Sequence, residues 1–192
     1  MKKNNNLKRR YFITILLLFL LRALDLFLTY IYIPDLSNEY NPIVSLFGAS
    51  WIGLISVQLV CLIIIAIIGF FYFKQRSIIV LEKNLNFTEF IYCYFNNELK
   101  PWRQRLWSSS VNFESHIIFF GFISISGAIL VSILAILNNF LLIMDIVWYR
   151  QFLTSNYKIF FPAIFFLVII SLILLFFKRE YSDYLDGYSK ED

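Results

Sequence analysis

Five polar residues lie close together where a long apolar run ends. Arg22, Asp25 and Thr29 are spaced three and four residues apart, and Glu39 and Asn41 follow in the next turn. In a helix this spacing puts the first three side chains on one face. Carboxylate, hydroxyl and amide oxygens are the donor set for a hard cation or an ammonium group. Two carboxylates, Asp25 and Glu39, could also share acid–base chemistry.

The same residues have an interpretation that needs no ligand. An unpaired charge inside a membrane costs a few kcal/mol on insertion scales, and Asp25 is the obvious partner that neutralises Arg22. Glu39 and Asn41 could cap the next helical segment, because Pro42 turns the chain there. These polar residues could therefore form either a structural scaffold or a ligand-binding site.

The surrounding chain has the composition of an integral membrane protein. Of its 192 residues, 59% are hydrophobic and only 16% are charged. A soluble domain of this size could not cover so much apolar surface. Four apolar blocks each approach or exceed the roughly 20 residues that cross a bilayer. They run over about 11–33, 51–73, 117–144 and 159–177.

The blocks predict an all-α, four-helix transmembrane bundle forming a single membrane domain, residues 1–192. A cleaved signal peptide is the alternative for the first block. It is disfavoured because no small-residue cleavage site follows and because Arg22 and Asp25 interrupt the apolar core.

Basic residues predict the orientation. Of the 17 Lys and Arg, 14 lie in the amino end, the middle loop 74–116 or the tail 178–192. The positive-inside rule then places both termini and that loop in the cytoplasm, and residues 34–50 and 145–158 outside. We expect a multi-pass protein of the prokaryotic cytoplasmic membrane. The net charge of +4 reflects this anchoring, so no nucleic-acid partner is expected.

The usual sequence marks of cofactor or catalytic sites are missing. Cys61 lies within the second apolar block and Cys93 lies in the middle loop, so the predicted topology excludes an extracellular disulfide between them. They form no CxxC motif, and His116 is the single histidine. No glycine-rich nucleotide loop, zincin motif or GxSxG elbow occurs. We therefore expect no cofactor and no metal, and an enzyme is the least favoured class.

The middle loop contains a predicted amphipathic helix at the membrane interface. Asn86 and Glu89 have the spacing of a capping box, and Pro101 limits the helix. Aromatic and basic residues suited to lipid headgroups follow. The interfacial set is Phe87, Phe90, Ile91, Tyr94, Phe95, Trp102, Arg103, Arg105 and Trp107. The alternative is a docking helix for a cytoplasmic partner.

The third apolar block carries a stripe of small residues on one helical face. Such stripes let helix backbones approach closely in lipid, so a packing face is predicted in preference to a pore lining. Its members are Gly121, Ser124, Ala128, Ser132 and Ala135.

Further polar side chains gather in the outer half of the predicted bundle. Asp25 is eight residues from the outer end of the first block, about 12 Å deep, and Gln58 is seven residues into the second, about 10 Å deep. Asn138 and Asn139 lie near the outer end of the third. Because polar groups in lipid turn inward, these residues predict a shallow polar pocket open to the outside.

The segments "DLFLT" (25–29) and "EYNP" (39–42) resemble a motif, Asp-x3-Thr followed by Glu-x-Asn-Pro. It is the hallmark of a family of small prokaryotic multi-helix membrane proteins known only as a domain of unknown function. The resemblance covers about a quarter of the chain. It implies a compact helical membrane domain and brings no reaction. The middle loop is longer than the family pattern, so its role is not carried over.

Three classes of function follow. A structural or assembly subunit, packing with other membrane proteins in the bilayer, is favoured. A small-solute or cation carrier or channel is second, and it would need a homo-oligomer because four spans are few for a transporter. An enzyme acting on lipid or peptide at the outer face is third, because no nucleophile with a base stands out.

Overall fold

The computed structural model describes residues 2–36, 44, 48–74, 84–96 and 112–188. The described elements are helices, with no strand among them. They are α1 (Lys2–Tyr32), α3 (Trp51–Lys74), α4 (Phe87–Asn96), α6 (Phe113–Ile143) and α7 (Val147–Tyr188). Four of them, α1, α3, α6 and α7, are long and apolar enough to span a membrane, and α4 is too short to do so. The predicted all-α membrane bundle is therefore confirmed.

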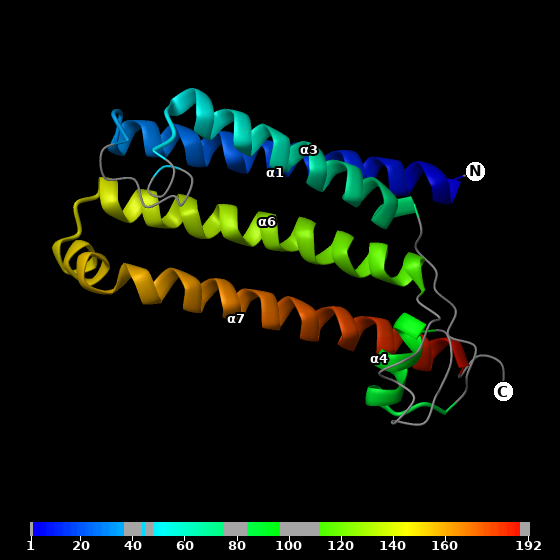
Figure 1. The fold of residues 1–192 in the computed structure, drawn as a ribbon. Coiled ribbons are helices and arrows are strands. Elements are labelled where there is room, and N and C mark those ends of the chain that lie inside the picture. Colours follow the sequence, from blue (N-terminus) through cyan, green and yellow to red (C-terminus); the bar gives the residue numbers. More distant parts are fainter. Residues whose placement is uncertain (1, 37–43, 45–47, 75–83, 97–111, 189–192) are drawn as a thin grey trace.

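Helix α6 is the centre of the bundle. It packs against α1 and α3, which also contact one another, and against α7 on its other side. The start of α1, the end of α7 and α4 lie at one end, here called the terminal end, and the α6–α7 turn lies at the far end (Figure 1). Which end faces the cytoplasm stays a prediction from the basic residues.

Small residues let α3 and α6 approach closely. A Cβ at Gly69 would lie 2.6 Å from Ile125 Cδ1, and one at Gly121 would lie 3.1 Å from Tyr72 Cγ. Ser132 is fully buried, with its hydroxyl donating to the Ala128 carbonyl at 2.6 Å. Gly121 and Ser132 thus lie in helix contacts, while Ser124, Ala128 and Ala135 are half-buried. Close backbone approach gives the van der Waals contact that holds helices together in lipid.

Helix α4 begins with the predicted capping box. The Asn86 N–H donates to Glu89 Oε2 at 3.0 Å, and the Glu89 N–H donates to Asn86 Oδ1 at 2.9 Å. Its apolar face is covered by protein, because Phe90 and Tyr94 are each only 1% exposed and their rings contact Tyr181 and Phe176 of α7. The other predicted interfacial residues, Trp102, Arg103, Arg105 and Trp107, lie outside the described residues, so membrane binding by this region stays a prediction.

Helix α7 is longer than the apolar block predicts. Its first turns, in the segment expected as an outer connection, are helical and run at an angle to the rest, with Pro162 inside the helix (Figure 1). No glycine or proline interrupts residues 145–161, so helix can begin well before the apolar run. Tyr149 and Leu153, spaced i to i+4, are buried against Leu142 of α6.

Candidate functional site

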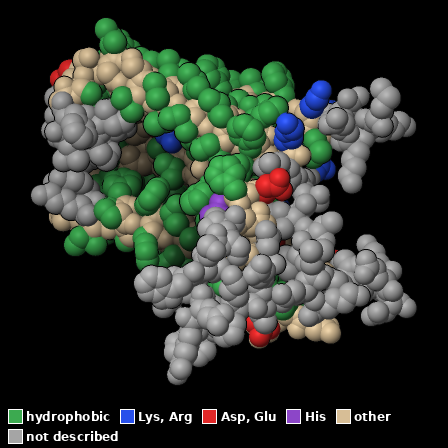
Figure 2. All heavy atoms as spheres, turned by 45° about the vertical axis from the view of Figure 1, so that its right-hand side comes forward, with side chains coloured by type: hydrophobic (Ala, Val, Ile, Leu, Met, Phe, Trp, Pro, Cys, Tyr) green, Lys and Arg blue, Asp and Glu red, His purple; other side chains and the backbone are tan. Residues whose placement is uncertain are grey.

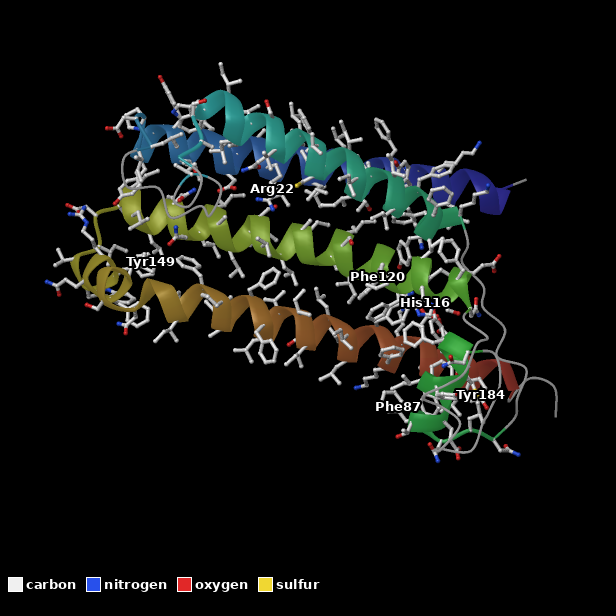
Figure 3. The ribbon with its side chains drawn as sticks, viewed as in Figure 1. Arg22, Phe87, His116, Phe120, Tyr149 and Tyr184 are labelled. Atoms are coloured by element: carbon white, nitrogen blue, oxygen red, sulfur yellow. The ribbon has the colours of Figure 1, made fainter. Side chains whose placement is uncertain are left out.

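The expected ion pair in α1 is present. Arg22 Nη1 donates to Asp25 Oδ2 across 3.4 Å, a long contact for a charge-assisted hydrogen bond. The Asp25 side chain is 10% exposed and that of Arg22 is 23% exposed. Figure 3 shows Arg22 inside the bundle, between α1 and α6. The i to i+3 spacing on one helix face is sufficient to bring the two side chains together.

Asn139 of α6 joins α1 to the central helix. Its Nδ2 donates to Asp25 Oδ1 at 3.1 Å and to Thr29 Oγ1 at 2.9 Å. Thr29 in turn donates to the Asp25 backbone carbonyl at 2.9 Å, which fixes its hydroxyl as an acceptor for Asn139. Asp25 and Thr29 are each 7% exposed. One amide group therefore uses both its N–H bonds to hold a carboxylate and a hydroxyl one helical turn apart.

Asn138 extends this network to α7. The Tyr149 hydroxyl donates to Asn138 Oδ1 at 2.7 Å, and Asn138 Nδ2 lies 3.4 Å from Asn139 Oδ1. Burial raises the pKa of Tyr149, so its hydroxyl keeps the proton that it donates. Figure 3 shows Tyr149 at the far end, between α6 and the first turns of α7. We call the group Arg22, Asp25, Thr29, Asn138, Asn139 and Tyr149 the far-end network.

Tyr149 is the member that sequence reasoning missed. It follows the predicted third span and precedes the fourth, in a segment assigned to an outer connection. The available signal was the i to i+4 pair with Leu153, an apolar spacing typical of a helix that packs on the bundle.

Gln58 lies at the level of this network but outside its hydrogen bonds. The Trp51 ring of α3 packs on Tyr30 of α1 with ring centroids 5.6 Å apart. Gln58 is seven residues after Trp51, and Arg22 is eight residues before Tyr30, so antiparallel packing brings them to one level. Within the described part of the chain, Gln58 Oε1 is buried and has no hydrogen-bond partner.

Glu39 and Asn41 of the predicted pocket lie outside the described residues. A pocket open to the far end therefore stays a prediction. Among the residues that the structure does describe, no three His, Cys, Asp or Glu side chains are grouped as metal ligands. The described oxygens of Asp25 and Thr29 already accept protein N–H groups. Chemically, the described arrangement fastens helices: one buried carboxylate is held by a guanidinium and an amide from two elements.

No protein-family model matches the chain, and comparisons with curated proteins and with solved structures likewise gave no match. The site therefore has to be interpreted from its own geometry.

Proposed function

We propose that this protein is a non-enzymatic structural or assembly subunit of a membrane complex. The observation that carries the proposal is the far-end network. Its polar groups come from α1, α6 and α7, and they are paired with one another across those helices. A transport or catalytic site needs groups left available for a substrate, whereas a scaffold uses them to fix helix positions.

The apolar flanks of the bundle support the same proposal. Helix α7 packs mainly on α6, and both helices have large apolar side chains exposed along the span. Phe140 and Leu137 of α6 are each 51% exposed, and Phe166 of α7 is 65% exposed. Figure 2 shows hydrophobic side chains over much of the visible flank. In a bilayer such surfaces face lipid or the helices of a partner subunit.

We also propose membership of the family with the Asp-x3-Thr and Glu-x-Asn-Pro motif. The described half of that motif, Asp25 with Thr29, binds Asn139 of another helix. This use gives the spacing a structural reason: a carboxylate and a hydroxyl four residues apart present two acceptors to one amide.

The test is the composition of the complex in mild detergent, measured by native mass spectrometry after affinity purification from the native membrane. We expect stoichiometric, reproducible partner subunits. Asn139→Leu should reduce their retention, while the same substitution at an exposed asparagine outside the network, Asn156→Leu, should not. A protein recovered only as a homo-oligomer would contradict the assembly proposal.

The carrier alternative is favoured by one observation, the buried Gln58 Oε1. An unused amide acceptor at the level of Arg22 is what a polar solute path would require. If the protein is a carrier, Gln58→Leu should abolish solute uptake into proteoliposomes without lowering thermal stability. If Gln58 only packs, the same change should leave function intact and raise stability slightly, since a buried unpaired acceptor is removed.

A further inference from the structure

A second polar group lies at the terminal end, around Arg179. Arg179 Nη2 donates to Glu180 Oε1 at 2.8 Å, and Nη1 lies 3.5 Å from the Tyr72 hydroxyl of α3. The guanidinium carbon lies 5.5 Å from the centre of the Phe122 ring of α6. Contacts from α3, α6 and α7 therefore orient this head group, although the side chain is still 39% exposed.

Several hydrogen-bond donors gather at this place beside the Glu180 carboxylate. The Tyr72 oxygen accepts from Arg179, so its own O–H proton is available to another acceptor. Burial, with a further contribution from Glu180, raises the pKa of Tyr94, so this phenol stays protonated beside Arg179 and Tyr72. Within the described residues the Tyr94 hydroxyl has no hydrogen-bond partner. Arg179 itself carries five N–H donors, of which two are used here.

The depth of the group matches the lipid headgroups. The apolar run of α7 ends at Phe177, and Lys178 and Arg179 follow immediately. Tyr72 lies two residues before Lys74, where α3 ends. Figure 2 shows Lys and Arg side chains gathered toward this end of the molecule, beside the hydrophobic flank. Phosphate groups of the bilayer lie at this boundary, just beyond a hydrocarbon core of about 30 Å.

Exposed apolar side chains precede Arg179 on α7 and neighbour Tyr72 on α3. Leu175, one turn before Arg179 on α7, is 59% exposed, and Phe71, next to Tyr72 on α3, is 40% exposed. A lipid whose phosphate binds Arg179 would lay its acyl chains along these side chains. A free phosphate ion would use none of this surface, so the two sources are distinguishable.

We propose that Arg179, together with the Tyr72 hydroxyl, binds the phosphate of an anionic membrane lipid at the junction of α3, α6 and α7. A planar guanidinium and a phenolic O–H group suit phosphate oxygens, which are strong acceptors. Basic positions between membrane helices are a recurrent way to hold such headgroups. The site is separate from the far-end network and does not depend on the proposed function.

The experiment is lipid titration of the purified protein in detergent, read by native mass spectrometry and by thermal stability. Phosphatidylglycerol should bind and raise the Tm, and phosphatidylcholine should bind more weakly. Arg179→Gln should weaken phosphatidylglycerol binding by about tenfold or more, the loss expected for a charged hydrogen bond. Lys178→Gln is the matched control, because it removes the same charge from the adjacent exposed residue, and it should change binding by less than about twofold.

Three results would overturn the proposal. Equal loss in Lys178→Gln and Arg179→Gln would indicate diffuse attraction and no defined site. Equal stabilisation by glycerol phosphate at the same concentration would indicate a soluble phosphate ligand. If Arg179→Gln fails to fold, Tyr72→Phe keeps the aromatic packing and removes only a hydroxyl. Unchanged preference for phosphatidylglycerol over phosphatidylcholine in Tyr72→Phe would then refute the site.

Discussion

Asn139→Leu should destabilise the bundle more than any other single amide change in the far-end network. The substitution removes the two hydrogen bonds, of 3.1 and 2.9 Å, that join α6 to Asp25 and Thr29. Hydrogen bonds between membrane helices average about 0.6 kcal/mol each, so the two contribute roughly 1.2 kcal/mol. The buried carboxylate also loses a donor, which adds about 1–3 kcal/mol. The expected loss is therefore roughly 2–4 kcal/mol.

The replacement gains little in return. Leucine in contact with lipid tails is no better buried in the folded bundle than in the separated helices, so no hydrophobic gain offsets the lost bonds. The assay is equilibrium unfolding of the purified protein by SDS in mixed micelles, with helical circular dichroism as the signal.

Asn138→Leu is the matched control for this prediction. It removes the bond to Tyr149 at 2.7 Å but leaves Asp25 and Thr29 their amide donor. Its expected cost is about 1 kcal/mol. Combining Asn139→Leu with Asp25→Leu should cost less than the sum of the two single changes, because the residues share one interaction. Equal costs for the two asparagine variants, or strict additivity with Asp25→Leu, would refute the reasoning.

Three further predictions follow from other contacts. Asp25→Leu should lower the folded yield more than Arg22→Leu. The first change removes the described partner of the Arg22 guanidinium, at a cost of about 2.5–3.5 kcal/mol. The second change leaves the Asp25 carboxylate its amide donor, Asn139. The double change should be better tolerated than Asp25→Leu alone, as size-exclusion yield and Tm would show. Gly121→Leu should cost about 1–3 kcal/mol by forcing α3 and α6 apart, since even a Cβ there meets a tyrosine ring; an unchanged Tm would contradict this contact. A single cysteine at Ser155, with the native cysteines removed, should react with an impermeant thiol reagent in intact cells, and one at Ser189 should not; the opposite pattern would invert the predicted topology.

Hydropathy was sufficient to predict the four spanning helices, because apolar runs of this length have few other structures available. Helical periodicity likewise predicted that Arg22, Asp25 and Thr29 share one face. Helical periodicity could not predict which residue of another helix binds that face. Gln58, Asn138 and Asn139 were all candidates by residue type and by their place in the predicted outer half, and the choice of Asn139 depends on how α1 and α6 are rotated against each other.

The terminal end was harder to anticipate for a related reason. The capping box and apolar face of α4 are local features, and both were visible in the sequence. The residues that cover that face come from a distant part of the chain. Tyr184 accepts the Leu85 N–H at 3.0 Å, and Tyr181 donates to the Leu85 carbonyl at 3.1 Å, almost 100 residues along the chain. Phe177, Tyr181 and Tyr184 share one helical face at i, i+4 and i+7, but that spacing does not predict which backbone groups the tyrosine hydroxyls bind.

The two ends of the bundle differ in the balance of contacts that hold their helices together. Lipid supplies no hydrophobic force between helices, so relative positions depend on small-residue contacts and on polar pairs. At the far end the positions of α1 and α7 on α6 depend on directional bonds to Asn139 and Asn138. At the terminal end a dense set of aromatic rings, with Phe176 fully buried among them, adds to the hydrogen bonds of Arg179, Tyr181 and Tyr184. Removing the Asn139 amide should consequently loosen the far end first and leave the aromatic end packed, because no ring contact there depends on it.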